Sequence, residues 1–572
     1  MPVSKTVVIV ALILIVAVGV IAYYIASLPS PPTTPTTPVT TPTTPITPTT
    51  PTTPTTPVTP PPVRMIIYAS LSEMTTADPS TDFSNSVMWL PLVYEPLLWY
   101  DPISDKFIPA LATNYSSSAD GLTWTFTIRR DAKFHDGTPV TAHAVKSSID
   151  RTITLGEGAA FIWDPVESIE APDDYTVVFH LKYPAALDKV AATTYAAYIF
   201  SPKIVEYAGA SDLTDPKVAD WFNSGNDAGS GPYKMIKWDP ENEVILEKFT
   251  EWWGWKLPDY PMKSDKAPDI FKIKVIKDAV TQETLILSGD IDIAMYVPLE
   301  NIEQHQKNPN LQVLLKPSFQ NLLMLVNVKK PPLDNVLVRR AIAHAVPYDD
   351  IVTVARNELA TVASGPVPRG MWGHFDNLTF TYDLKLAREL LAQAGYPSGI
   401  GRTLVLTYTA GDIYEARTAD LIRASLAQIG INVEIRPLSW EEQWALAQKG
   451  WEDPNIAQDF LIFYWWPDVV SPFTFLYNMF HNASKAFNLC YYENAEFNAL
   501  IEEAVVLEGV DEAKALELYY RAQKILHDDV PGVPLWDMID LRVAKASIGN
   551  LDKAVNPAYP TVVFAQVLSV GG

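Results

Sequence analysis

The sequence predicts an α/β protein of two or three lobes with mainly parallel sheets. The chain has 572 residues, which is too long for one hydrophobic core, because single cores stop growing at roughly 250–300 residues. Over residues 383–436, helix-like stretches alternate with short strand-like ones, which is the pattern of βαβ units in a parallel sheet. An uncharged apolar run at residues 7–26 precedes this α/β region.

That apolar run predicts one transmembrane helix within residues 1–28. As a helix, 20 residues cover about 30 Å, the thickness of a bilayer core. Lys5 precedes the run and no Lys or Arg follows before Arg64, so we expect the amino terminus in the cytoplasm and the remainder outside. The predicted location is the cell membrane, with an extracellular head. A cleaved signal peptide is the alternative.

Residues 29–63 consist almost wholly of Pro and Thr and predict an extended stalk between the anchor and the head. Such a composition cannot bury enough apolar area to offset the entropy of ordering, and Thr-rich stalks outside cells are commonly O-glycosylated. In the head, Asn114, Asn377 and Asn482 each begin an Asn-X-Ser/Thr triplet, so these three are possible N-glycosylation sites.

Composition and motifs exclude several classes of function. A net charge of −23 argues against a nucleic-acid partner, which needs clustered Lys and Arg. The single cysteine, Cys490, excludes an internal disulfide and a cysteine-based zinc cluster. The sequence contains no HExxH, no GxSxG and no phosphate-binding loop. We therefore predict no cofactor, no metal site and no enzymatic activity.

A stretch near the start of the head predicts a strand, a turn and a helix. Residues 122–128 alternate between Thr and large apolar side chains, as in a half-buried strand. Residues 135–139, His-Asp-Gly-Thr-Pro, predict a turn. Thr141 can then cap a helix that begins at Ala142. Two later helices are expected to begin after Asp383 and Asp511, which are favoured cap residues.

The amino-acid sequence of these segments resembles that of family 5 solute-binding proteins, the dipeptide, oligopeptide and nickel receptors of ABC importers. The matching segments occur in the family's order and are PALATNY, GLTWTFTIRRDAKFHDGTPVTAHAV, GSGPY, SGDIDIAMY and NVKKPPLDNVLVRRAIAHAV. One departure is Ala144, where the family usually has an acidic residue that would complete a capping box.

The resemblance implies a two-lobed, periplasmic-binding-protein-like fold with an extra domain. Its predicted parts are residues 64–108, 225–326 and 541–572 for lobe I, 109–224 for the additional domain of lobe I, and 327–540 for lobe II. It also implies a receptor whose lobes close over a ligand by hinge motion. The implied partners are the ligand and the permease subunits of an ABC transporter, with the membrane contacted through the amino-terminal helix.

The resemblance further implies a ligand site around residues 465–476, which match the family pattern W..D...P..FL. It assigns Asp468 to the positive α-amine of a peptide, because a cation in a desolvated cleft needs a carboxylate partner. Trp465 and Trp466 belong to the same segment. The alternative is that Asp468 only caps a turn before Pro472.

Three further residues match positions that line the ligand site in the family. They are Trp440, Trp536 and Glu73. The two tryptophans are equally consistent with the hydrophobic core, and Glu73 with an exposed side chain that has no ligand.

The ligand class stays open between peptides and oligosaccharides. Asp468 and Glu73 favour di- or oligopeptides, because both place a negative charge where an α-amine needs one. The 16 tryptophans favour an oligosaccharide, since flat aromatic faces stack on sugar rings. A different class of protein, a surface-anchored glycoside hydrolase with paired carboxylates, is the remaining alternative.

Overall fold

The computed structural model describes residues 63–83, 85–102 and 104–571. The chain divides into two units, Met1–Pro61 and Pro62–Gly572, and the fold below is that of the second. The predicted transmembrane helix and nearly all of the predicted stalk lie outside the described residues. None of the described helices combines the length and apolar character that a membrane-spanning helix needs.

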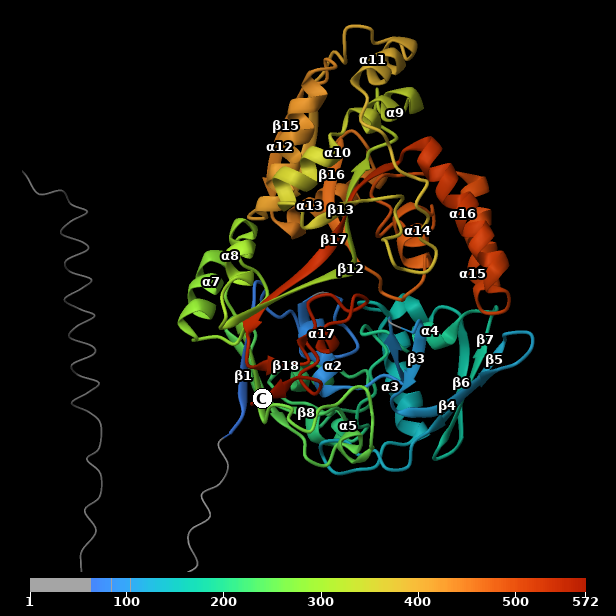
Figure 1. Cartoon of the computed structure of the whole chain (residues 1–572). Coiled ribbons are helices and arrows are strands. Elements are labelled where there is room, and N and C mark those ends of the chain that lie inside the picture. Colours follow the sequence, from blue (N-terminus) through green and yellow to red (C-terminus); the bar gives the residue numbers. More distant parts are fainter. Residues whose placement is uncertain (1–62, 84, 103, 572) are drawn as a thin grey trace, which may run out of the picture. The chain divides into compact units, whose positions relative to one another are not determined.

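A sheet of eleven strands runs through the described part of the chain (Figure 1). Its order is β15-β14-β16-β12-β17-β11-β1-β10-β9-β8, and β13 pairs with β17 outside this path. Strands β1 and β8 to β11 form the sheet of lobe I, and β14 to β16 form that of lobe II. The bounds are β1 Met65–Ser70, β8 Tyr233–Asp239, β9 Glu243–Lys248, β10 Ile270–Val275, β11 Ile293–Ala294, β12 Leu311–Val326, β13 Ala360–Val362, β14 Leu404–Thr409, β15 Val433–Leu438, β16 Phe460–Trp465 and β17 Gly532–Lys545.

The prediction of mainly parallel sheets is wrong. Among the described strands, four of the ten pairings in the large sheet are parallel, namely β1 with β10 and β11, and β14 with β15 and β16. The other six are antiparallel. The main reason is the pair β12 and β17, the strands by which the chain enters lobe II and returns from it, so they run in opposite directions (Figure 1). The βαβ pattern is confirmed in lobe II, where β14 lies parallel to both neighbours.

The β12–β17 ladder is interrupted where it passes between the lobes. One stretch pairs Leu311 to Pro317 with Lys545 to Ile539, and the next begins at Asn321 opposite Asp537. Pro317 lies at the interruption. Proline has no backbone N–H and cannot donate a ladder hydrogen bond, so it fits a position where the pairing is interrupted anyway.

A second sheet lies within residues 109–224, the segment predicted as the additional domain, and is antiparallel throughout, in the order β4-β5-β7-β6. Its bounds are β4 Ala112–Ser117, β5 Thr123–Ile128, β6 Val166–Asp173 and β7 Thr176–Leu181. Strand β5 and the following helix α3, Ala142–Leu155, are confirmed predictions. The Thr141 side chain accepts the Ala144 N–H at 3.4 Å, and Gly156 ends the helix in the left-handed conformation. The strand and helix therefore serve as framework.

The other elements cover these sheets. Two short pairs are β2 Leu98–Asp101 with β3 Lys106–Pro109, and β18 Ile548–Gly549 with β19 Ser569–Val570. The helices are α2 Leu90–Val93, α4 Leu187–Val190, α5 Ile204–Ala208, α6 Pro216–Asn223, α7 Ala279–Ser288, α8 Ile302–Gln306, α9 Val336–Ala345, α10 Tyr348–Asp350, α11 Leu384–Gln393, α12 Ile413–Ala427, α13 Trp440–Gln448, α14 Phe473–Phe480, α15 Ala495–Glu508, α16 Glu512–Asp529 and α17 Leu551–Ala554.

The predicted amino-terminal ends of two of these helices, α11 and α16, are confirmed. Asp383 accepts the N–H groups of the first turn of α11 at 2.9 Å. Asp511 accepts an N–H of α16 at 3.1 Å. Each carboxylate satisfies backbone donors that have no partner inside the helix.

Candidate functional site

Three loops leave the carboxyl ends of the parallel strands in lobe II. Helix α12 follows β14, α13 follows β15, and α14 follows β16 after a short loop. Ile422 of α12 packs in the core cluster on one face of the sheet, and Ala447 of α13 packs in the cluster on the other. In open α/β sheets, ligands bind outside the carboxyl ends of strands where connections depart to opposite faces. This edge is therefore the candidate site.

Asp468 lies in the loop after β16 and is buried, with 4% of its surface exposed. Its Oδ2 accepts a hydrogen bond from Nδ2 of Asn478 at 2.9 Å. Burial raises the pKa of the Asp468 carboxyl to about 8, although the Asn478 hydrogen bond opposes that rise. No cation among the described residues offsets the burial. A positively charged ligand group placed here would supply the missing partner.

Hydrogen bonds from the extra domain hold the Asp468 loop. The Thr193 hydroxyl donates to the carbonyl oxygen of Asp468. Nε1 of Trp466 donates to the Tyr195 hydroxyl at 2.9 Å. Trp465 instead points into the core, where its Nε1 donates to the Thr474 carbonyl at 3.1 Å. The loop is thus bonded to the segment that contains Thr193 and Tyr195.

A chain of aromatic rings runs along the same face of the sheet. It begins at Trp440, which is 39% exposed. The centroid distances are 6.3 Å from Trp440 to Phe463, 5.9 Å from Phe463 to Trp465, and 5.6 Å from Trp465 to Phe487. Phe487 then lies 5.5 Å from Phe83, which comes from lobe I. The predicted residues Trp440, Trp465 and Trp466 therefore gather near Asp468.

A cavity of about 800 Å³ borders this cluster, a volume typical of ligand sites. It lies between residues 158–190 and residues 469–508. Asn478, which donates to Asp468, lines it, as do Phe161 and Phe487. Its apolar walls suit the body of an organic ligand. At its rim, Nζ of Lys189 pairs with Oε1 of Glu508 at 2.7 Å.

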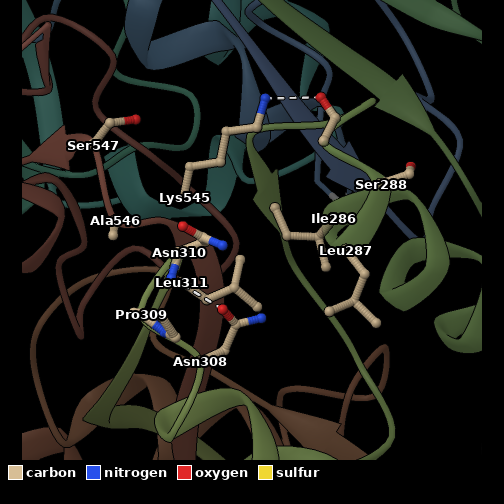
Figure 2. Close-up of a pocket in the computed structure, with 11 residues that line it drawn as sticks. Ile286, Leu287, Ser288, Asn308, Pro309, Asn310, Leu311, Lys545, Ala546 and Ser547 are labelled. Atoms are coloured by element: carbon tan, nitrogen blue, oxygen red, sulfur yellow. Dashed lines mark hydrogen bonds between the residues drawn. The ribbon is translucent and has the colours of Figure 1, made fainter.

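A second cavity, of about 540 Å³, lies beside the end of α7, the start of β12 and the end of β17 (Figure 2). It is lined by the end of α7, residues 308–311 and residues 545–547. Lys545 already donates to the Gly289 carbonyl at 2.8 Å and to Asp292 at 2.6 Å. None of the predicted site residues lines it, and its charged group has partners, so it is a weaker candidate.

Trp536 and Glu73 lie elsewhere. Trp536 is fully buried on the opposite face of the lobe II sheet, with its ring centroid 5.5 Å from that of Tyr464. Its Nε1 has no hydrogen-bond partner among the described residues. Glu73 is exposed and pairs with Nζ of Lys277 at 2.5 Å. No described contact brings Glu73 to the Asp468 cluster.

Sequence reasoning missed several residues of the site. Thr193, Tyr195, Phe161 and Phe83 come from segments about 270 to 390 positions before Asp468, and no periodic pattern links such distant segments. Asn478 could have been found, because it lies on the buried face of the helix that follows Asp468. The three asparagines of the glycosylation triplets are exposed, and their modification stays a prediction.

Comparisons with known proteins give a consistent family. The family model described as "Bacterial extracellular solute-binding proteins, family 5 Middle" matches residues 106–487. The chain is 29% identical over 484 residues to a probable D,D-dipeptide-binding periplasmic protein, DdpA, of Escherichia coli K12, covering 83% of this chain and 89% of the relative. It is 28% identical over 448 residues to the glutathione-binding protein GsiB of Pectobacterium atrosepticum, covering 77% and 82%.

Solved structures agree. The periplasmic binding protein DppA of Helicobacter pylori, in complex with the peptide STSA, superimposes with a TM-score of 0.75 at 26% identity. The match covers 89% of this chain and 98% of that structure. A dipeptide-binding protein of Pseudoalteromonas, at 20% identity and a TM-score of 0.75, shows the same two-lobed fold.

Proposed function

The chain belongs to the family 5 bacterial extracellular solute-binding proteins, receptors that deliver ligands to ABC importers, and we propose that its ligand is a short peptide. The observation that carries this proposal is Asp468, a buried carboxylate without a described cationic partner. In the proposal its carboxylate holds the peptide α-amine, since a desolvated cation requires an opposite charge and hydrogen bonds.

The relatives support a peptide. Their names give a D,D-dipeptide and glutathione as ligands, and the solved relative holds the peptide STSA. All three are short peptides or built like them. The apolar cavity beside Asn478 would receive ligand side chains, and Trp440, Trp465 and Trp466 would form the aromatic border of the site.

A second candidate is an oligosaccharide in the same receptor. The observation that favours it is Trp440, whose exposed ring stands at the edge of the candidate site next to Trp444, with 5.0 Å between their centroids. Flat, exposed indole rings stack well on apolar faces of ligands. Asp468 has no evident role with a neutral sugar, so we rank the peptide first.

We propose binding and release without chemistry on the ligand. Binding energy in such receptors is used for hinge closure of the lobes, here about the interrupted ladder between β12 and β17. The predicted boundaries of lobe I, the additional domain and lobe II belong to this proposal. The permease subunits of an ABC transporter are the proposed partners.

We also propose that the amino-terminal apolar run anchors the head to the membrane and that the Pro/Thr-rich stalk gives it reach. The apolar run and nearly all of the stalk lie outside the described residues. Deleting residues 29–63 should leave ligand affinity unchanged and impair uptake by membrane vesicles that contain the transporter. Normal uptake by the deletion variant would show that the stalk is dispensable.

The direct test is titration calorimetry of the protein with panels of di- to pentapeptides and of oligosaccharides, followed by mass spectrometry of the recovered ligand. We expect saturable binding of peptides that are recovered unchanged. Binding confined to oligosaccharides would favour the second candidate, and formation of a product would contradict the receptor role.

A further inference from the structure

A buried ion pair joins helix α4 to the end of helix α15. Nζ of Lys189, in α4, lies 2.7 Å from Oε1 of Glu508, the last residue of α15, and the two side chains are 11% and 4% exposed. Lys189 belongs to residues 109–224, the segment predicted as the additional domain, and Glu508 belongs to lobe II (Figure 1). The pair therefore crosses between two parts of the protein that the predicted domain boundaries separate.

Lobe II surrounds the Lys189 ammonium with an aromatic ring and a hydrogen-bonded carboxylate. Nζ lies 4.0 Å from the centroid of the Trp372 ring, a position that favours a cation. Oε2 of Glu508 accepts hydrogen bonds from the Ser471 hydroxyl at 2.8 Å and from the Tyr519 hydroxyl at 2.7 Å. We call these four residues of lobe II the lysine socket.

The charge of Lys189 suits this socket. Burial lowers the pKa of the Lys189 ammonium, but the charge of Glu508 and the hydrogen bond to it, followed by the charges of Glu512 and Asp188, raise that pKa above its ordinary value. Lys189 is therefore charged at neutral pH. Glu508 lies at the carboxyl end of α15, where the helix dipole disfavours a negative charge. A buried carboxylate at this place needs the cation that Lys189 supplies.

The backbones of the two parts approach each other closely beside this ion pair. A Cβ atom added at Gly509 would lie 2.7 Å from the carbonyl carbon of Ala185, well inside the roughly 3.5–4.0 Å of an unstrained carbon contact. Gly509 has a φ of −83°, which other residues adopt without strain. The approach of Ala185, rather than the backbone conformation, therefore excludes a larger residue at Gly509.

On its other side, the segment of residues 109–224 is fastened to lobe I. Nη1 and Nη2 of Arg151, in α3, donate to Oδ1 and Oδ2 of Asp78 at 2.7 and 2.5 Å, and both side chains are at most 1% exposed. Such a bidentate pair between an arginine and a carboxylate is among the strongest polar contacts in proteins. We therefore expect this segment to move with lobe I, so that opening of the lobes would separate Lys189 from its socket.

We propose that Lys189 and the lysine socket form a latch, made by the protein alone, that holds the two lobes closed. This inference rests on the hinge closure of the proposed function and adds a contact in which the ligand takes no part. Ser471 links the latch to the candidate site, because it lies three residues after Asp468 and its hydroxyl donates to Glu508. A ligand that fixes the Asp468 loop thereby also fixes one wall of the socket.

The experiment measures the distance between the lobes of the full-length protein by double electron–electron resonance. Spin labels are attached through Lys146→Cys in α3 and Lys385→Cys in α11, at two lysines whose side chains are 41% and 87% exposed. The native Cys490 is buried, and burial raises the pKa of its thiol to about 12, so the labels react with the introduced thiols. Distances are recorded without ligand and with trialanine as the probe peptide.

With an intact latch, the ligand-free protein should show a short-distance, closed population beside an open one, and trialanine should enlarge the closed population. Lys189→Met leaves Glu508 without its cation in the closed state, so the ligand-free closed fraction should fall at least threefold. Lys189→Arg keeps the charge and should retain part of the closed fraction. Adding Glu508→Gln to Lys189→Met leaves neither charge of the pair buried alone and should recover part of the loss.

Gly509→Ala tests the latch without changing any charge. Its methyl group would collide with Ala185 only when the two parts are in contact, so it should also lower the closed fraction, while circular dichroism shows an unchanged content of helix and strand. The matched control is Lys217→Met, which removes an exposed lysine of the same segment whose Nζ donates to the Gly209 carbonyl at 3.0 Å. This control should leave the closed fraction unchanged.

Two results would overturn the latch. One is a protein with an intact latch that is entirely open without ligand, and the other is a closed fraction that neither Lys189→Met nor Gly509→Ala lowers. If trialanine still shortens the distance between the lobes in these cases, the proposed function stands. If no peptide of the di- to pentapeptide panel changes the distance, the proposed function fails instead, while the ligand-free populations still decide whether the latch exists.

Discussion

Asp468 and Arg356 offer a comparison between two buried ionisable groups of the same protein. Both are almost completely buried. Asp468 has no cation beside it among the described residues, whereas Arg356 lies close enough to Asp412 to oppose the rise that burial causes in the pKa of that carboxyl. They differ in what surrounds them. Asp468 accepts a hydrogen bond from Asn478, which lines an apolar cavity, whereas the guanidinium of Arg356 lies over two aromatic rings. The buried Asp468 carboxyl, which lacks a cationic partner among the described residues, matches a ligand that carries an amine.

The two groups also respond differently when the site is empty. The Asp468 carboxyl can take up a proton, and burial raises its pKa to about 8, so it avoids a buried charge at neutral pH. The guanidinium of Arg356 has no such option. The empty site is therefore close to neutral at Asp468 near pH 7. Binding of a ligand amine at Asp468 must therefore release the proton of the Asp468 carboxyl, whereas the guanidinium of Arg356 keeps its proton throughout.

The largest expected effect is on the Asp468 side. Asp468→Asn should weaken binding of a free tripeptide by about 100-fold or more, because removing one partner of a buried charge pair costs roughly 3–5 kcal/mol. Calorimetry measures the change. The matched control is Glu95→Gln, which alters a buried carboxyl whose pKa is raised to about 7 by burial and whose donors are Trp252, Ser230 and Trp253. If Asp468→Asn bound the tripeptide with unchanged affinity, Asp468 could not be the partner of the peptide amine.

The same substitution should stabilise the ligand-free protein at neutral pH. The unfolded chain releases the Asp468 proton near pH 4, whereas the folded chain keeps it until about pH 8. The folded state thus binds more protons in this window, and stability falls by up to about 1.4 kcal/mol for each pH unit gained. The Asp468→Asn variant should lack this contribution. A parallel pH profile of unfolding temperature in both proteins would contradict the assignment.

A smaller effect is expected from pH on ligand binding. Between pH 6 and 8 the peptide amine is largely protonated, but the free Asp468 carboxyl must first lose its proton. Affinity should therefore rise by up to about tenfold per pH unit toward pH 8 and then level off as the amine itself loses its proton. Calorimetry in two buffers of different ionisation enthalpy should reveal about one proton released at pH 6. Affinity that stays constant over this range would argue against Asp468.

The smallest effect is expected at Glu73. This side chain is exposed and paired with Lys277, and exposed ion pairs contribute about 0–1 kcal/mol. Glu73→Gln should change peptide affinity less than twofold. A tenfold loss would show that Glu73 reaches the ligand and would restore the role that the resemblance assigns to it.

Local signals explain which parts of the fold were predictable. The β5 strand, the α3 start at Thr141 and the helix starts after Asp383 and Asp511 depend on neighbouring residues, and all were predicted from the sequence. The directions of β12 and β17 depend on how the chain passes between lobes, which periodicity does not encode. The prediction of mainly parallel sheets failed for that reason.

The candidate site divides in the same way. One segment, whose sequence resembles a motif of the family, contains Asp468, Trp465 and Trp466. These three residues could therefore be predicted as site residues from the sequence. Trp440 joins them through ring contacts that the structure adds. Arg356 gave no sequence signal, because a lone arginine at a helix end usually faces solvent. Only the structure distinguishes Arg356 from other arginines, by its burial and by its side-chain donors without a hydrogen-bond partner among the described residues.

The central claim is that the site holds the amine of a short peptide at Asp468. It is tested most directly by comparing one tripeptide with its N-acetylated form in calorimetry at pH 7.5. The account predicts that acetylation, which removes the positive charge, weakens binding by about 100-fold or more. Equal affinity for the two forms would contradict it.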